Sequence, residues 1–418
     1  MKSYSHLWEQ YISPENYLLA VHNATCHKGG TKKKYRKARY FKIHAEELMP
    51  QMLEYAANFR NDSHKPMEIY DGIRRKKRKI IVPSMREQVV HHMLINVLKP
   101  IFMKPMYRHS YGSIPGRGAS AKRYTGHRKG KKKKNTLGGK EAIEKFIRDH
   151  PEDCRYCLKM DIRKFFDSVP HRILKEKFRR LIHDERFLQV IDTVIEANGK
   201  DVGMPIGFYT SQWFANFYLT GLDHYIKEQL RAKAYFRFMD DMVIFGSNKR
   251  DLHRIRKEVE IYLNEELGLE LNPSWQVFRF HYVKRNGKEI GRFLDFMGFR
   301  FYRNRTTLRQ TLMLRATRKA RKISRKKPKT SYDCRQMLSY KGWISPANVY
   351  GMYRKWIKPY VSFRQLRRIV SKTQKKENQE RSKEHVEQER KQRRDPAGSP
   401  GQKVQPGVRL CAQRLCAG

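Results

Sequence analysis

The chain has 418 residues, and its 91 lysines and arginines outnumber its 41 aspartates and glutamates, giving a formal net charge of +50. A chain of this length can form two or three domains with a sizeable core. So large a positive charge predicts a polyanionic partner such as nucleic acid. An aromatic content of 12% argues against a wholly disordered basic protein.

The first 60 residues are predicted to form a helical extension. Within it we expect a basic loop around Lys32–Arg39 and a helix over His44–Phe59. Apolar arms then bracket six consecutive cations at Arg74–Lys79. This pattern favours a hairpin that grips phosphates over a merely solvated basic turn.

The next segments alternate between regular and irregular structure. Pro83–Phe102 has the start signal and apolar spacing of a helix. Ser110–Tyr124 is rich in glycine and basic residues, which suits a loop close to a nucleic-acid backbone. Gly126–Gly139 is a low-complexity cationic stretch, predicted to be a flexible insertion. Lys140–Asp149 reads as a short helix.

Three later segments place polar residues where strands or helices end. Tyr156–Ile162 is predicted to be a strand with Asp161 at its end. Gly203–Leu222 is predicted to be an irregular loop followed by a helix capped at Thr210 or Ser211. Tyr235–Phe245 reads as two strands joined by an Asp240–Asp241 turn. Taken alone, that acidic turn favours a simple solvated hairpin over cation binding.

The remainder of the chain is basic and largely helical. An amphipathic helix over Lys249–Leu267 should end at Gly268, and LELNPSWQVF and Phe293–Tyr302 are strand-like. Basic helices are expected from Arg305 to Val370. Lys372–Gly418, with 12 basic and 6 acidic residues, is predicted to be disordered.

Targeting signals and cysteines add two further expectations. The sequence has no apolar run of 18 residues and no signal-peptide core at its start, so we expect a soluble, cytoplasmic protein with no membrane contact. Cys154 and Cys157 form one CxxC pair without a second pair. An incidental pair of reduced thiols is therefore favoured over a zinc or redox site.

The order of the acidic residues suggests a specific chemistry. In-line attack of a 3′-hydroxyl on an α-phosphate can be assisted by two divalent ions roughly 3.5–4 Å apart. Such ions need only one or two carboxylates beside phosphates and water. Asp161 at a strand end and Asp240 at a hairpin turn could supply them, with Asp241 turned elsewhere by strand alternation.

Four motifs together resemble the reverse transcriptase family over roughly Glu68–Tyr360. They are FMDD at Phe238–Asp241, DIRKFFDSV at Asp161–Val169, FMGF at Phe296–Phe299 and LGLELNPSWQ at Leu267–Gln276. The resemblance implies an RNA-directed DNA polymerase with an α+β right-hand fold, in which an antiparallel palm sheet carries the catalytic hairpin. The implied divisions are an N-terminal extension at 1–60, fingers at 61–155 with the insertion 126–139, a palm at 156–302, a helical thumb at 303–371 and a tail at 372–418.

A subtype is also suggested. MPIGFYTSQWFAN at Met204–Asn216 is similar to a motif of the reverse transcriptases of diversity-generating retroelements, as are NPSWQV and SYKGWISPANVY. This likeness implies error-prone copying of a template RNA into cDNA, chiefly at template adenines, from a DNA primer and dNTPs. It also implies a small basic accessory protein as a partner.

The resemblance assigns roles to individual positions. Two Mg²⁺ ions would be held by Asp161, Ile162 through its carbonyl, Asp240 and Asp241. The nucleotide would be bound by Lys76, Arg78, Phe166, Ile206 and Gly207. Template and primer would be contacted by Ser211, Gln212, Phe296, Met297, Gly298 and Phe299. Phe166 resembles a steric gate against the ribose 2′-hydroxyl, although a core phenylalanine would also fit.

Two alternatives stay open. One is another bacterial reverse transcriptase, of the group II intron, retron or phage-defence type. The other is a non-catalytic RNA-binding protein that keeps the fold. Intact Asp161, Asp240 and Asp241 argue against the second alternative. Ile206 and the TSQ triplet at 210–212 favour the diversity-generating type over the first, since most other reverse transcriptases carry Gln in the position of Ile206.

Overall fold

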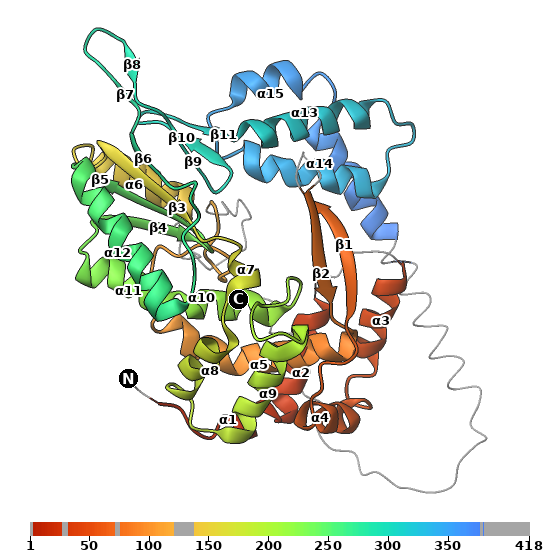
Figure 1. Ribbon diagram of the computed structural model, residues 1–418. Coiled ribbons are helices and arrows are strands. Elements are labelled where there is room, and N and C mark those ends of the chain that lie inside the picture. The colour runs from red at the N-terminus through yellow and green to blue at the C-terminus, as the bar shows by residue number, and fades with distance from the viewer. Residues whose placement is uncertain (1–2, 27–31, 72–75, 121–137, 377–378, 380–418) are drawn as a thin grey trace, which may run out of the picture. The chain divides into compact units, whose positions relative to one another are not determined.

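The computed structural model describes residues 3–26, 32–71, 76–120, 138–376 and 379 (Figure 1). The side chains of residues 32–35, 70, 71 and 76 lie outside this description. The chain divides into two compact units. The first holds residues up to Arg315 together with Trp343–Gly351, and the second holds Ala316–Gly342 and the part that follows from Met352. No helix in the described ranges is long and apolar enough to cross a membrane.

A four-stranded antiparallel sheet is central to the first unit. Its order is β4 (Ala234–Phe238), β5 (Asp241–Gly246), β3 (Tyr156–Asp161) and β6 (Gln276–Arg279). Aromatic and β-branched residues dominate these segments, which suits half-buried strands. The two predicted arms of the acidic hairpin and the strand before Asp161 are therefore confirmed. Of the strand-like LELNPSWQVF segment, only its end from Gln276 is a strand, because Pro273 lies in a turn.

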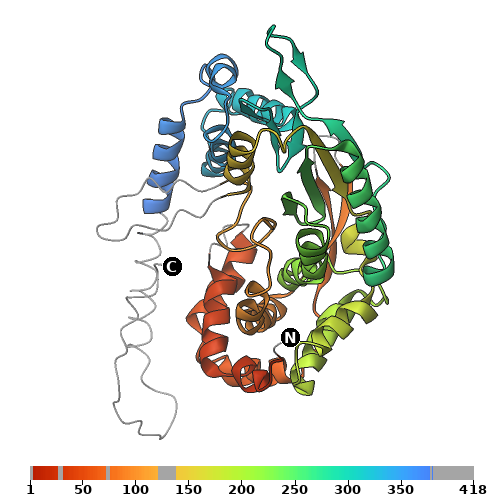
Figure 2. The ribbon, with the colours of Figure 1, turned by 90° about the vertical axis from the view of Figure 1, so that its left-hand side faces the viewer.

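The two faces of this sheet pack differently. Leu158 and Met160 of β3 share one face with Met242 and Ile244 of β5, within the main core. That core includes α12 (Lys249–Leu267), which lies across the sheet in Figures 1 and 2. On the other face, aromatic rings of β4 and β5 meet Phe146 of α6 (Gly139–Asp149).

Helices form the rest of the first unit's core. The helix predicted over Pro83–Phe102 is α5 (Met85–Met103), which Ser84 and Glu87 cap reciprocally. It packs on α2 (Pro14–Thr25) and on α10 (Tyr209–Tyr218). The other helical segments here are α1 (Leu7–Tyr11), α4 (Met49–Ala57), α7 (Phe165–Ser168), α8 (His171–Arg179), α9 (Glu185–Ile195), η1 (Glu196–Asn198), α11 (Thr220–His224) and η2 (Tyr225–Gln229).

Two expectations for the N-terminal extension need correction. The predicted basic loop at Lys32–Arg39 is part of a helix, α3 (Lys32–Ile43). The segment contains no Gly or Pro, and Lys, Arg and Ala are good helix formers, so its charge does not break the helix. The predicted helix at His44–Phe59 begins only at Met49, with Pro50 in its first turn.

Two hairpins and a small sheet are separate from the central sheet. Strands β1 (Lys65–Asp71) and β2 (Lys76–Val82) pair antiparallel, as predicted, although residues 72–75 of the basic run lie outside the described residues. A small hairpin comprises β7 (Tyr282–Val283) and β8 (Glu289–Ile290). A separate three-stranded sheet has the order β11 (Thr306–Leu308), β10 (Phe299–Phe301) and β9 (Leu294–Phe296).

The C-terminal part is helical and basic, as expected. Its named helices are α13 (Gln310–Ser324), α14 (Ser331–Ile344) and α15 (Tyr350–Trp356). In the second unit, Asp333 binds Lys319 at 3.1 Å and Lys326 at 2.7 Å, which joins α13 to α14. Residues 363–376 are also helical, so the expectation of disorder is wrong for 372–376. Most of the predicted tail and of the 126–139 insertion lies outside the described residues.

Candidate active site

The structure brings the three predicted aspartates to one end of the central sheet. Asp161 is the last residue of β3 and pairs directly with Asp241, the first residue of β5. Because side chains alternate along strands, directly paired residues share a face of the sheet. Asp240 lies in the adjoining turn, and its carbonyl accepts a hydrogen bond from the Ile162 amide at 3.4 Å.

The hairpin turn differs from the expected Asp–Asp turn. It consists of Met239 and Asp240, because Asp241 already pairs with Phe238 in the sheet. Met239 has a φ of 57°, a backbone conformation that costs a non-glycine residue about 1 kcal/mol or more. Asp240 therefore lies in the turn, whereas Asp241 belongs to a strand, so the two neighbouring carboxylates have different surroundings.

Burial and mutual repulsion perturb both carboxylates of the hairpin. The pKa of Asp240 is raised to about 6, first by burial and then by repulsion from and hydrogen bonding with Asp161. Burial likewise raises the pKa of Asp241 to about 7, although Lys159 opposes this rise. The Lys159 ammonium lies 3.5 Å from Asp241 Oδ2, whereas Asp241 Oδ1 is buried with no hydrogen-bond partner in the described part of the chain.

These donors fit a hard divalent cation. Clustered carboxylate oxygens are the ligands that Mg²⁺ prefers, and a cation would relieve the repulsion that raises both pKa values. The orphaned Oδ1 of Asp241 is a further acceptor available to such an ion. The three aspartates do not, however, offer three oxygens within 4.8 Å of one another, as a single tight site would require.

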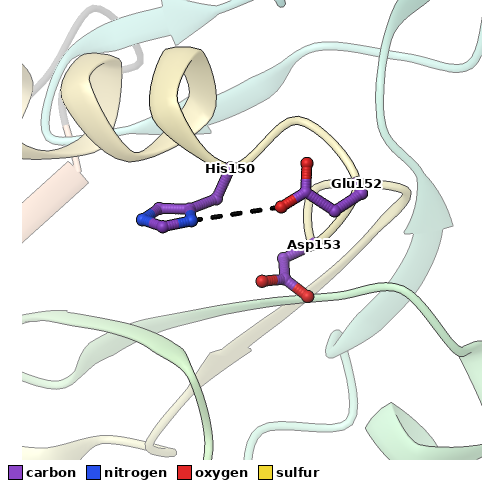
Figure 3. Close-up of side chains that lie close together, drawn as sticks. All are labelled: His150, Glu152 and Asp153. Atoms are coloured by element: carbon purple, nitrogen blue, oxygen red, sulfur yellow. Dashed lines mark ion pairs between the residues drawn. The ribbon is translucent and has the colours of Figure 1, made fainter.

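A second group of possible metal ligands, on the surface, is packed more tightly than the three aspartates. His150, Glu152 and Asp153 each offer a ligand atom, and these atoms lie within 4.8 Å of one another (Figure 3). His150 Nδ1 and Glu152 Oε1 are 4.0 Å apart on an exposed loop after α6. Asp153 is already paired with Lys233 at 3.0 Å, so this surface cluster lacks the uncompensated charge of the aspartate site.

Asn272 holds Asp161 in place, a role that the sequence did not suggest. Its backbone amide donates to the Asp161 carbonyl at 2.8 Å, and its side-chain amide donates to Asp161 Oδ2 at 3.1 Å. Lys159 was also missed, although its spacing of two from Asp161 could have placed it on the same strand face. Asn272 could not be found this way, because its contact depends on a loop more than 100 positions away in the chain.

The β1–β2 hairpin is hydrogen-bonded to the Ile206–Gly207 loop of the predicted nucleotide pocket. The Ile81 amide of β2 donates to the Ile206 carbonyl at 2.8 Å. Gly207 has a φ of 123°, and a Cβ there would lie 2.2 Å from the Ile81 carbonyl oxygen, so only glycine fits. Arg78 of the same hairpin lowers the pKa of Asp240 electrostatically, which places this cation near the carboxylates. The side chain of Lys76 lies outside the described residues.

Phe166, the predicted steric gate, is in contact with the loop that carries Ile206. Its ring is half-buried and lies 5.5 Å from that of Phe165, centroid to centroid. Its carbonyl accepts a hydrogen bond from Met204 at 2.6 Å, which ties it to the loop that carries Ile206. The partial exposure is compatible with both the gate and the packing role, and the assignment stays a prediction.

The predicted cap of α10 is wrong. The helix begins after Phe208, and Thr210 and Ser211 lie inside it without capping its end. Ser211 is buried, and its hydroxyl donates to the Pro205 carbonyl at 2.8 Å. Gln212 is exposed, so of the two predicted template contacts it is the one with an accessible side chain.

The predicted primer-contacting segment forms a tight turn between β9 and β10. Phe296 and Phe299 pair across this turn and are fully buried in their small sheet. Met297 and Gly298 have φ values of 49° and 83°. The Gly298 carbonyl accepts from the Arg309 amide at 2.9 Å, so the turn is fixed at the start of α13. The two phenylalanines are thus packing residues here, and primer contact stays a prediction.

The CxxC pair shows no sign of activation. Cys154 and Cys157 are both buried and free. Burial raises the pKa of the Cys154 thiol to about 12 and raises that of Cys157 as well. Neither thiol is therefore a thiolate near neutral pH, as a metal ligand or redox nucleophile would need to be.

Comparison with known proteins gives a consistent family match. Residues 63–295 match the family described as "Reverse transcriptase (RNA-dependent DNA polymerase)". Protein YkfC of Escherichia coli K12 is 25% identical over 242 residues, covering 47% of this chain and 58% of the relative. The retron Ec73 reverse transcriptase of Escherichia coli is 26% identical over 203 residues, covering 45% of this chain and 55% of that protein.

Two further similarities concern an intron protein and a solved structure. An uncharacterised 91 kDa protein in a cob intron of Schizosaccharomyces pombe is 27% identical over 165 residues, covering 38% of this chain and 18% of that protein. The chain thus spans less than two thirds of each of these curated relatives. Among solved structures, apo telomerase from Candida tropicalis is similar with a TM-score of 0.42 and 12% identity, over 71% of this chain and 56% of that one.

Proposed function

Because this chain belongs to the reverse transcriptase family, we propose that it is an RNA-directed DNA polymerase. The family match and the antiparallel sheet also confirm the expected α+β right-hand polymerase fold. The observation that supports the activity best is the meeting of Asp161, Asp240 and Asp241 at one end of β3 and β5. The expected bounds of fingers, palm and thumb remain part of the proposal.

The chemistry assigned to the site is nucleotidyl transfer. Asp161 and Asp240 would hold two Mg²⁺ ions, with Asp241 and the Ile162 carbonyl in support. Bound there, the ions would lower the pKa of the attacking 3′-hydroxyl and neutralise the departing pyrophosphate. The chain's own contribution is positional: Asn272 fixes Asp161, and the Ile162 amide holds the carbonyl of Asp240.

The remaining groups would bind the substrates. Arg78 lies near Asp240 and would neutralise the incoming triphosphate, with Lys76 as a second cation. Phe166 would exclude the ribose 2′-hydroxyl, and Ile206 with Gly207 would line the nucleotide pocket. The template RNA and the DNA primer would lie against Gln212 and the Phe296–Phe299 turn.

We further propose that the enzyme serves a diversity-generating retroelement. Ile206 supports this subtype because an aliphatic side chain cannot hydrogen-bond to a base or sugar, so selection among bases should weaken. Mutagenic cDNA would then arise mainly at template adenines, with a small basic accessory protein as partner. Flanking DNA with two imperfect repeats that differ at the adenines of one copy would support the subtype, and its absence would count against it.

A retron or intron-encoded reverse transcriptase is the second candidate. The names of a retron reverse transcriptase and of an intron protein among the relatives favour it. Both candidates share the polymerase chemistry and differ in template and product. A uniform error spectrum on a defined RNA template would favour this second candidate over the diversity-generating type.

The polymerase proposal is tested by replacing Asp240. The wild-type chain should extend a DNA primer on an RNA template with dNTPs and Mg²⁺. Asp240→Asn removes one charge from the metal-binding set and should reduce incorporation by about 10²–10³-fold or more. Asp153→Asn is the matched control, because it alters the surface cluster in Figure 3 and should leave incorporation unchanged. Full activity of the Asp240 variant would overturn the assignment.

A further inference from the structure

A completely buried arginine lies directly behind the turn that carries Asp240. Arg237 of β4 has no exposed surface, and neither has its partner Asp223 of α11. Its Nε donates to Asp223 Oδ1 at 2.7 Å and its Nη2 donates to Asp223 Oδ2 at 2.6 Å. This two-point pairing fixes the plane of the guanidinium as well as its position.

The remaining nitrogen of this guanidinium reaches the turn itself. Arg237 Nη1 donates to the Met239 carbonyl at 3.0 Å and to Asn216 Oδ1 at 3.2 Å. The Met239 carbonyl belongs to the peptide bond that precedes Asp240. Since the Ile162 amide holds the carbonyl that follows, both peptide groups flanking Asp240 are fixed by hydrogen bonds.

Further contacts confine the turn from its sides. Asn216 Nδ2 donates to the Gly112 carbonyl at 2.8 Å, and the same nitrogen lies 3.4 Å from Met239 Sδ. A Cβ at Gly112 would lie only 2.4 Å from Met239 Cγ, so this glycine allows the methionine to pack. The Tyr235 hydroxyl completes the network by donating to Asp223 Oδ1 at 2.7 Å.

Stability alone is a weak explanation for this arrangement. Replacing a buried ion pair by apolar residues of similar volume is often neutral or stabilising. The surrounding face of the sheet is otherwise apolar, with Met242 and Ile244 in the main core. The polar network does, however, hold Met239 at its φ of 57°, a conformation that an unsupported methionine would tend to leave.

We propose that Arg237 is a positioning residue for Asp240, acting through the Met239 carbonyl. Asp223 and Tyr235 orient the guanidinium, and Asn216 links it to α10, the helix that follows the Ile206–Gly207 loop. By fixing the backbone on both sides of Asp240, the network sets the direction of the Asp240 side chain. This inference rests on the proposed polymerase function.

The test compares two buried substitutions with different consequences. Arg237→Lys keeps the charge but cannot pair with Asp223 at two points and also reach Met239. Tyr218→Phe is the control, because it removes the buried hydrogen bond from Tyr218 to the Leu267 carbonyl, on the other side of α10. Both variants should lose some thermal stability. Activities are therefore expressed per active site, and the active sites are counted from the amplitude of the pre-steady-state burst of primer extension.

Two readouts separate positioning from simple support of the fold. For Arg237→Lys we expect kcat per active site to fall about 10–100-fold, with a nearly unchanged KM for dNTP, because misplacement by about 1 Å can cost 10²-fold. We also expect weaker binding of Mn²⁺, measured by electron paramagnetic resonance with primer–template bound and His150→Ala present to remove the surface cluster. Tyr218→Phe should change neither quantity.

Other outcomes would overturn the inference. If Arg237→Lys loses only active fraction, with normal kcat and Mn²⁺ binding, Arg237 is structural. If that variant does not fold, Tyr235→Phe removes a single bond to Asp223 and should give a smaller loss of kcat in the same direction; an unchanged kcat would overturn the proposal. A wild-type chain without polymerase activity would instead refute the proposed function, and the Mn²⁺ comparison would still test the role of Arg237.

Discussion

Asp240 and Asp241 are neighbours in the chain but have different surroundings. Asp241 begins a strand, and Lys159 lies 3.5 Å from one of its oxygens. Lys159 is itself fixed by donating to the Asp295 carbonyl at 2.9 Å. Asp240 lies in the turn, where a backbone hydrogen bond and the charge of Arg78 favour its ionised form. This difference supports the prediction that Asp240 is the principal metal ligand and Asp241 its support.

The raised pKa of Asp241 predicts how stability depends on pH in metal-free protein. Its pKa is about 7 in the folded chain and 3.8 in a model peptide, so the folded state binds the proton more tightly. The stability that this carboxyl contributes is fully present below about pH 4 and is lost as the pH rises through 7. Asp241→Asn does not titrate and should therefore be more stable than wild type at pH 8, by roughly 1–3 kcal/mol.

The measurement is urea unfolding in EDTA at pH 5 and pH 8. The difference between Asp241→Asn and wild type should be small at pH 5 and larger at pH 8. Asp201→Asn serves as the control, because Asp201 is exposed and should give the same small difference at both pH values. An equal difference for Asp241→Asn at the two pH values would show that its burial does not perturb its ionisation.

At the scale of elements, the sequence predicted most of what has a local cause. The strands beside Asp161 and Asp240, the capped helix after Pro83 and the end of α12 at Gly268 all follow from apolar periodicity, capping residues and glycine. The basic α3 was missed because charge was taken as a sign of a loop. Asn272 was missed because its contact with Asp161 joins segments 111 positions apart in the chain, whereas Lys159 could have been found from strand alternation.

The hydrogen bond between Ile81 of β2 and the Ile206 carbonyl leads to a prediction about the fidelity of DNA synthesis. Since the Ile206 carbonyl is held by Ile81, a substitution at 206 should change the side chain without moving the backbone. Ile206→Gln adds hydrogen-bonding groups to the proposed nucleotide pocket and should lower misincorporation opposite template adenines several-fold. Sequencing of cDNA made on a defined RNA template measures this rate.

Val202→Gln is the matched control for that experiment. Val202 is an exposed apolar residue on the same loop, and its substitution should leave the error spectrum unchanged. An unchanged error rate in Ile206→Gln, with normal incorporation, would remove Ile206 from the fidelity determinants. It would leave the polymerase assignment intact, because that assignment depends on the aspartates.

At the scale of the whole molecule, the net charge of +50 raises the question of which surfaces bind nucleic-acid phosphates. One such surface is the β7–β8 hairpin, which projects beyond the sheets of the first unit in Figures 1 and 2. Its exposed tip carries Lys284, Arg285 and Lys288, and none of these side chains forms an ion pair with another described residue. Gly287 and Gly291, both with positive φ, shape the turn and its base.

This hairpin predicts part of the salt dependence of nucleic-acid binding. Each phosphate neutralised by a cation contributes about −0.9 to the slope of log K against log salt on duplex DNA, and about −0.7 on single strands. Replacing Lys284, Arg285 and Lys288 by alanine should therefore reduce the slope for a primer–template by roughly 2, with weaker binding at low salt. The same change at Arg250, Arg254 and Lys257, which are exposed on α12, should alter the slope less. Fluorescence anisotropy between about 50 and 200 mM salt measures both slopes, and equal effects would mean that the hairpin contributes only to the general positive field of the chain.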